Sequence, residues 1–158
     1  MSKKLERLYT KAGENLQNEV YDCYPRPQLK RDSFFNLNGF WQFSAVKVGQ
    51  EPDYKETIRV PYCPESILSG IEKTYKKGTA FYYKREFSLP NGFIKDKVIL
   101  HFGAVDQIAE VYLNGKLLGS HIGGYEAFSF DITNELKENN ELLQKNGKTS
   151  IQILFFMI

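Results

Sequence analysis

Hydrophobic residues beyond Phe34 occur in short aromatic or β-branched runs, which are separated by Asn, Gly, Pro and charged clusters. This spacing is typical of antiparallel strands in a β-sandwich. The chain shows neither a sustained helical period nor a repeat of fixed length. We therefore predict an all-β fold, a jelly-roll-like two-sheet antiparallel sandwich. The predicted strands span residues 40–46, 57–60, 81–87, 98–102, 109–113, 116–121, 128–132 and 150–156.

The clearest local signal is a hairpin around Asn114-Gly115. Asn-Gly favours a two-residue type I′ turn, because both central positions need a positive φ. Strand 98–102 is almost continuously apolar, which indicates cover on both faces. Strand 128–132 alternates as a half-buried strand does, and we expect Thr133 to cap a short helical turn that runs to Leu136.

The N-terminal region differs from the rest of the chain in its pattern of polar and apolar residues. Residues 1–23 form a polar lead whose loosely helical pattern is interrupted at Gly13. Pro25 and Pro27 then impose an extended path, because each proline fixes its own φ and restricts the preceding residue. We predict a tether over 1–23 and one sandwich domain over 24–158.

Composition supports one β-rich core and excludes several functions. The 158 residues include 12 Phe and 10 Tyr, which suit half-buried strands, and a chain of this length buries a single core. The net charge of +2 is scattered, so no basic stripe favours nucleic acid. No apolar run approaches the ~20 residues of a membrane span. The start carries no apolar signal segment, so a cytoplasmic location is expected.

The two cysteines, Cys23 and Cys63, have no further Cys or His at metal-ligand spacing. We therefore expect no zinc site and no cofactor. The cysteines could pair in an exported protein, but two free thiols are the preferred interpretation.

A series of short sequence motifs, called words here, resembles the motifs of a known protein family. The words, in order, are Tyr24-Pro25-Arg26-Pro27-Gln28-Leu29, Leu37-Asn38-Gly39-Phe40-Trp41, Val60-Pro61, Pro64-Glu65-Ser66, Tyr83-Lys84-Arg85-Glu86-Phe87, Phe102-Gly103-Ala104-Val105-Asp106, Val111-Tyr112-Leu113-Asn114-Gly115, Gly123-Gly124-Tyr125 and Phe128-Ser129-Phe130-Asp131-Ile132-Thr133. From about Thr10 to its end, the chain resembles the N-terminal domain of glycoside hydrolase family 2, which includes β-galactosidases, β-glucuronidases and β-mannosidases.

The resemblance implies a non-catalytic jelly-roll domain that precedes an immunoglobulin-like sandwich and a catalytic barrel. Both catalytic glutamates of the family lie in that barrel, about 5 Å apart across the scissile bond. Family members also continue the last strand into a polar loop that reaches the substrate pocket, whereas this chain stops at Ile158. We therefore expect a C-terminal truncation and a chain that does not hydrolyse glycosides alone.

Four residues are candidates for contact with sugar or with a neighbouring domain: Tyr75, Lys76, Lys77 and Tyr125. Sugar binding combines an exposed aromatic ring with convergent hydrogen bonds. Tyr82 and Tyr83 are further tyrosines for which we expect exposure. Lys76 and Lys77 occupy a loop where the resemblance implies a polar residue near the sugar, although a solvated loop is the simpler interpretation.

Other residues that could carry chemistry are expected to be structural. Carboxylate pairs such as Glu110 with Asp106, or Glu126 with Asp131, arise in any chain with 19 acids. The residues with an expected scaffold role are Trp41 in the core, His101 and His121, Asp106 as acceptor of backbone N–H groups at a strand end, and Arg26 and Arg85 in internal or interdomain ion pairs.

Three functions remain open from sequence. The chain is the front domain of a family 2 glycosidase, a free-standing carbohydrate-binding module, or a protein-interaction sandwich without sugar affinity. The resemblance favours the first, with the remaining domains of the glycosidase and a β-galactoside or β-glucuronide as partners. Exposure of the aromatic end at Phe155-Phe156 would favour self-association.

Overall fold

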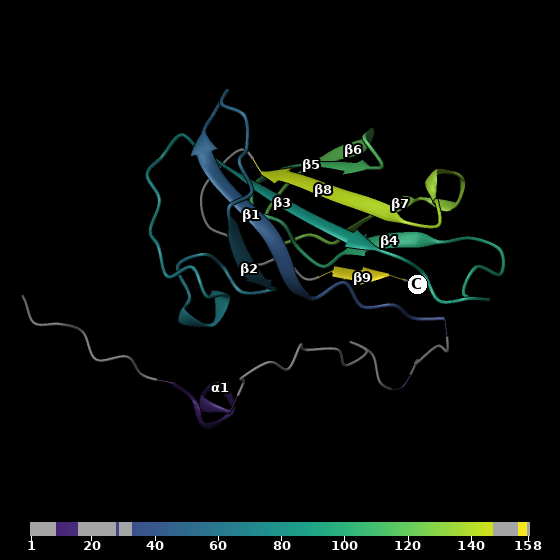
Figure 1. Ribbon diagram of the computed structural model, residues 1–158, viewed down its shortest axis with the longest axis horizontal. Helices are drawn as coiled ribbons and strands as arrows, with labels where there is room; N and C mark the ends of the chain where they lie inside the picture. Colours follow the sequence, from purple (N-terminus) through teal and green to yellow (C-terminus); the bar gives the residue numbers. More distant parts are fainter. Residues whose placement is uncertain (1–8, 16–27, 29–32, 147–154, 158) are drawn as a thin grey trace, which may run out of the picture.

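The computed structural model describes residues 9–15, 28, 33–146 and 155–157, and its main body is a two-sheet antiparallel sandwich (Figure 1). This confirms the predicted fold class. The elements, in chain order, are α1 Lys11–Glu14, β1 Gly39–Lys47, β2 Glu56–Val60, the 3-10 helix η2 Ile67–Ser69, β3 Thr79–Phe87, β4 Ile99–Phe102, β5 Ile108–Leu113, β6 Lys116–Ile122, β7 Phe128–Asp131, the 3-10 helix η3 Thr133–Glu135, β8 Asn140–Asn146 and β9 Phe155–Met157.

The larger sheet has six strands in the order β2-β1-β3-β8-β5-β6, and the smaller has three in the order β7-β4-β9. Every pairing between these strands is antiparallel. Because β8 lies between β3 and β5, strands that are distant in sequence become neighbours. The two sheets bury one hydrophobic core between them, as the chain length predicted.

The core is built by period-two alternation along each strand. In β1, Trp41 and Phe43 point inward and are fully buried, whereas Phe40 and Gln42 point outward. The rings of Phe43 and Phe81 from adjacent strands stack with centroids 5.9 Å apart. In β4, Leu100 and Phe102 are fully buried, while Ile99 and His101 are half-buried rather than fully covered.

The segment that leads into β1 is fixed to this core by hydrogen bonds. The indole Nε1 of Trp41 donates to the carbonyl oxygen of Leu37 over 2.8 Å, so Trp41 is a core residue, as predicted. Arg85 Nη1 donates to the carbonyl oxygens of Leu37 and Asn38 at 2.6 and 2.8 Å. Within the described residues Arg85 makes these backbone contacts rather than an internal ion pair, the interdomain ion pair stays a prediction, and Arg26 lies outside the described residues. Burial lowers the pKa of Arg85.

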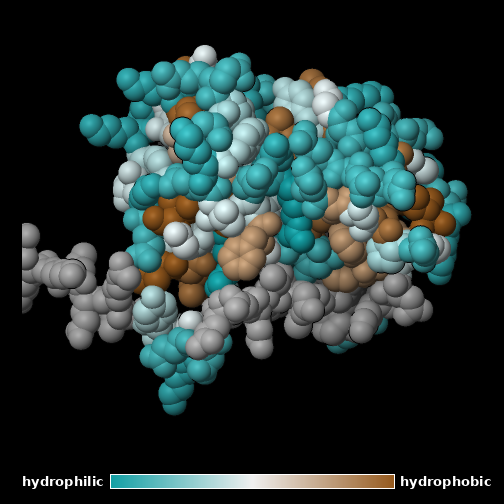
Figure 2. Space-filling view, viewed as in Figure 1, coloured by the Kyte–Doolittle hydropathy of each residue, from teal (hydrophilic) through white to brown (hydrophobic). Residues whose placement is uncertain are grey.

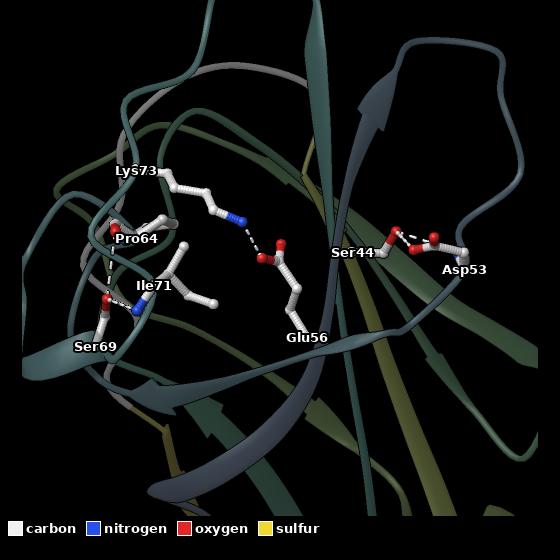
Figure 3. A network of polar contacts seen from close by, with 7 residues as sticks. All are labelled: Ser44, Asp53, Glu56, Pro64, Ser69, Ile71 and Lys73. Carbon is white, nitrogen blue, oxygen red and sulfur yellow. Dashed lines mark hydrogen bonds and ion pairs between the residues drawn. The ribbon is translucent and has the colours of Figure 1, made fainter.

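The crossover between β2 and β3 is held by a second set of contacts, which Figure 3 shows in close-up. Lys73 forms an ion pair with Glu56 of β2. The hydroxyl of Ser69 donates to the carbonyl oxygen of Pro64 over 3.3 Å and accepts from the backbone N–H of Ile71. The ion pair joins the crossover to the six-stranded sheet, and the Ser69 bonds hold the crossover in its folded-back path.

The predicted hairpin is confirmed as β5 and β6, with positive φ angles of 54° at Asn114 and 83° at Gly115. The Asn114 side chain also makes hydrogen bonds that the Asn-Gly turn motif does not predict. Its amide nitrogen donates to Glu135 and Asn140, and its amide oxygen accepts from the N–H of Glu141. The turn is therefore attached to the start of β8.

Strand β8 was not predicted. The sequence pattern instead placed a last strand over 150–156, most of which lies outside the described residues, with β9 at its end. In β8 the inward positions are Asn140, Leu142, Gln144 and Asn146, and three of these four are polar. Because polar residues occupy core positions, the hydrophobic alternation that marks a strand was hidden.

Two smaller expectations were wrong in detail. Thr133 does not cap η3 with its side chain; the carboxylate of Asp131 accepts from the N–H and hydroxyl of Thr133 at 3.1 and 2.6 Å. Gly13 lies within α1 rather than breaking it, and Thr10 caps this short helix. The boundary at residue 24 stays a prediction, because residues 16–27 are outside the described part.

The visible surface is mostly hydrophilic, with separate hydrophobic patches (Figure 2). Within the described ranges, the structure contains no helix of sufficient length and apolar character to span a membrane.

Candidate functional site at the loop end of the sandwich

One end of the six-stranded sheet gathers the loops that carry the sequence-predicted site. Strands β1, β8 and β6 finish here, and β3 and β5 begin here, because their registers pair Lys47 with Thr79, Ala109 with Asn146, and Ile108 with Ile122. We call this edge the loop end; its described loops are 48–51, 76–78, 103–107 and 123–127.

Backbone and side-chain hydrogen bonds connect these loops to one another. The N–H of Val48 donates to the carbonyl oxygen of Gly78 over 3.0 Å, and the N–H of Gly123 donates to that of Gln107 over 2.7 Å. The side-chain amide of Asn146 donates to the carbonyl oxygen of Asp106. The last residue of β8 thus positions the loop between β4 and β5, a contact that sequence reasoning missed together with β8.

Asp106 is the acid at the centre of this end. Its half-buried carboxylate packs so closely on Gly124 that a Cβ there would lie 2.6 Å from Asp106 Oδ1. Loss of hydration on burial raises the pKa of Asp106. The sequence predicted that its carboxylate accepts backbone N–H groups; among the described residues it accepts none, and the backbone carbonyl of Asp106 instead accepts from Asn146.

The predicted contact residues divide into two groups. Lys76, Lys77 and Tyr125 are exposed, and the Tyr125 side chain is 100% accessible. Tyr75 instead packs edge-on against Phe43 and Phe81, with ring centroids 6.3 and 5.1 Å away. Burial, followed by the charges of nearby glutamates, raises the pKa of Tyr75 to about 12. Tyr75 is therefore a half-buried ring of the core rather than an exposed platform.

The exposed candidates share the loop end without meeting. Lys76 and Lys77 precede β3, whereas Tyr125 follows β6. Three strand spacings separate β3 from β6, so their ends lie about 14 Å apart. Exposure was also expected for Tyr82 and Tyr83. Tyr83 is instead fully buried, and Tyr82 is half-buried.

Glu110 and His121, two residues that could carry acid-base chemistry, make structural contacts. Glu110 is bound by Lys145 and Tyr112, not by Asp106, and its pKa is lowered mainly by the hydrogen bond from Lys145. His121 stacks on Phe128 with centroids 4.2 Å apart. A general acid must hold its proton near neutral pH, which a carboxyl with a lowered pKa does not do.

Potential metal ligands were considered over the same described ranges. There, no three His, Cys, Asp or Glu side chains gather in a way that could hold a metal ion. Cys63 is a half-buried free thiol, and Cys23 lies outside the described residues.

Comparison with known proteins assigns the chain to a family. Residues 56–153 match the family described as the glycosyl hydrolase 2 galactose-binding domain-like family, which covers most of the sandwich from β2 onward. The chain belongs to this family. The resemblance seen in the sequence is thereby confirmed, and the all-β sandwich is the fold of this galactose-binding-like domain.

Relatives of this glycosidase domain are much longer proteins. Over 111 residues the chain is 41% identical to a β-galactosidase of Thermoanaerobacter pseudethanolicus, a match that covers 66% of the chain and 15% of that enzyme. Over 122 residues it is 32% identical to a β-glucuronidase of Formosa agariphila, covering 68% of the chain and 12% of the enzyme.

Solved structures give the same picture. A Bifidobacterium dentium β-glucuronidase, complexed with coumarin-3-O-glucuronide, superposes with a TM-score of 0.59 at 30% identity and covers 75% of the chain but 21% of that protein. A Faecalibacterium prausnitzii β-glucuronidase superposes with a TM-score of 0.64 at 25% identity, and the match covers 79% of the chain and 22% of that protein. The chain thus corresponds to one non-catalytic domain of larger glycosidases.

Proposed function

We propose that this domain supports the active site and the assembly of a retaining β-galactosidase or β-glucuronidase, and that it does not hydrolyse glycosides by itself. The observation that carries the proposal is the partial coverage of its relatives: the matched segment is 15% of a β-galactosidase and 12% of a β-glucuronidase. The chemistry then belongs to the remaining domains, which are the proposed partners.

The arrangement of the loop end supports this role. Hydrogen bonds from Val48, Gly123 and Asn146 join its loops into a connected edge, which suits a surface that packs on another domain. Lys76, Lys77 and Tyr125 are exposed there and are the residues proposed to contact the neighbouring domain or its β-galactoside or β-glucuronide substrate. A cytoplasmic location completes the proposal, and cell fractionation tests it.

Complementation provides the direct test. The purified full chain is added to the Thermoanaerobacter pseudethanolicus β-galactosidase from which the matching 111-residue segment has been removed. We expect the chain to co-elute with the truncated enzyme and to raise its turnover of a chromogenic galactoside. The chain alone should give the buffer rate. Turnover of a chromogenic galactoside or glucuronide by the chain alone would show that it is itself an enzyme.

A further inference from the structure

A groove of about 410 Å³ opens on the outer face of the six-stranded sheet, beside the loop end. This volume lies within the range of roughly 300–1,000 Å³ that is common for small-molecule sites. Its floor comes from β3, β8 and β5, and one wall comes from the turn that follows β1. We call it the outer groove; the lining residues used below are Val48, Tyr82, Ile108, Glu110 and Lys145.

The pleat of the sheet places the three central side chains in one row. Tyr82 of β3 pairs with Lys145 of β8, which pairs in turn with Glu110 of β5. Tyr82 alternates with the buried residues Phe81 and Tyr83, so its half-buried ring faces outward. Val48 and Ile108 add exposed apolar surface at the rim, with 63% and 38% of their surface accessible.

Two of the three charged residues that line the outer groove are paired with each other. Lys145 Nζ lies 2.9 Å from Glu110 Oε2, which also accepts from the Tyr112 hydroxyl over 3.2 Å. Glu51, at the opposite wall, is exposed to solvent. The row therefore presents a donor and an acceptor side by side with no net positive charge, which disfavours phosphate or uronate ligands.

The backbone under the groove is unavailable to a peptide strand. β3, β8 and β5 are interior strands of the sheet, each hydrogen-bonded to a neighbour on both sides. A peptide that binds by strand addition needs an open edge, which these strands do not offer. Sugars instead require an apolar surface for one ring face and paired donors and acceptors for the hydroxyl groups.

We propose that the outer groove binds a neutral oligosaccharide, one sugar ring of which lies against Tyr82 and the apolar rim while its hydroxyl groups bridge Glu110 and Lys145. This goes beyond the supporting role proposed above and does not depend on it, because the groove and its charges belong wholly to this chain. Complementation of a truncated glycosidase and binding in the groove are separate measurements.

An NMR titration of the full chain with β-1,4-galactotetraose tests the proposal. We expect saturable shifts of the backbone amides of Tyr82, Glu110 and Lys145. Tyr82→Ala should weaken binding about tenfold through loss of the ring surface, whereas Tyr82→Phe keeps the ring and the affinity. A tetragalacturonate of the same length should bind at least about tenfold more weakly, because its carboxylates meet Glu110 and Glu51.

Phe40→Ala is the matched control, since it removes a ring of similar size from an exposed position at the opposite end of the six-stranded sheet and should leave affinity unchanged. Thermal melts of each variant show whether it is folded. The proposal is overturned by absence of saturable binding, by shifts confined to 123–125, or by unchanged affinity in folded Tyr82→Ala. Shifts at the groove that depend on protein concentration without sugar would assign it to a second copy, and would equally overturn it.

Discussion

At the scale of single residues, close packing between the sheets leaves some positions room for hydrogen only. Gly119 of β6 is one, because a Cβ at this position would lie 2.7 Å from Cε1 of Phe130. Phe130 in turn packs edge-on against Phe102 and Phe128. The ring is therefore held by its neighbours and cannot move aside freely.

We accordingly expect Gly119→Ala to destabilise the fold by about 1–3 kcal/mol, the usual effect of overpacking. Urea denaturation measures the difference. Ser120→Ala, on the next and exposed position of the same strand, should change stability by less than about 0.5 kcal/mol. Equal effects of the two substitutions would show that strand propensity rather than the Phe130 contact governs this site.

Asp106 gives a prediction about pH. Burial raises its pKa in the folded chain, so the folded state favours the protonated acid and this group's contribution to stability falls as pH rises above the unfolded value of 3.8. The isosteric Asp106→Asn removes the charge but keeps the backbone carbonyl that Asn146 binds. At pH 7 we expect Asp106→Asn to be more stable than the native chain by at most about 1 kcal/mol.

The difference should disappear below the unfolded pKa, where Asp106 is protonated in both states. Thermal melts of the two proteins at neutral and acidic pH provide the measurement. A variant that is less stable at neutral pH would show instead that the carboxylate makes a favourable contact in solution.

At the scale of secondary-structure elements, local signals predicted most of the sheet. The hairpin was predictable because Asn114-Gly115 encodes its own turn, and the strands that end near Pro61, Pro90 and Gly103 carry both an apolar run and a stop signal. Strand β8 lacks this signature, since Gln144 and Asn146 occupy buried positions. Its place between β3 and β5 depends on tertiary packing, which overrides local propensity.

Some features of the candidate site could likewise be predicted from local sequence, and others could not. Exposure of Tyr125 followed from its glycine loop, but burial of Tyr75 depends on a crossover that folds back onto Phe43 and Phe81. The outer groove could not be predicted, because Lys145 belongs to the strand whose pattern was hidden. Residues that come together through register, rather than through sequence proximity, require the topology first.

Gln144 of β8 offers a test of this polar core. Its side chain is fully inaccessible, and within the described residues neither of its amide atoms has a hydrogen-bond partner. Replacement by leucine, of similar volume, removes two desolvated polar atoms, so Gln144→Leu should stabilise the chain by about 1–2 kcal/mol. Gln42→Leu is the control on the exposed face of β1 and should be neutral. A destabilised Gln144→Leu would indicate that the amide is hydrogen-bonded in solution.

At the scale of the whole molecule, the sandwich is a scaffold with two different surfaces. The loop end offers exposed lysines and a tyrosine beside a desolvated acid, while the outer face carries paired charges and a tyrosine in a groove. Both surfaces rest on β8, which contributes Asn146 to the first and Lys145 to the second. A change that displaces this strand should therefore alter both surfaces together.

Self-association is the remaining prediction at this scale. The side chains of Phe155 and Phe156, on which the sequence based it, lie outside the described part, and β6 offers a second candidate surface for it. This strand ends the six-stranded sheet, with a strand partner on one side only in the described part of the chain, and its Leu117 and Ile122 are 51% and 76% accessible. An open edge with apolar side chains favours pairing with another chain. Light scattering should show a mean mass that rises with concentration, and Ile122→Lys should reduce this rise by opposing both burial and edge pairing.

Ser129→Lys separates the local effect from simple charge repulsion, because it adds the same charge to an exposed position of β7 in the other sheet. It should leave association nearly unchanged. If both lysine variants dissociate the protein equally, net charge governs association and the β6 edge has no special part in it. A native chain that stays monomeric at every concentration would remove the prediction altogether.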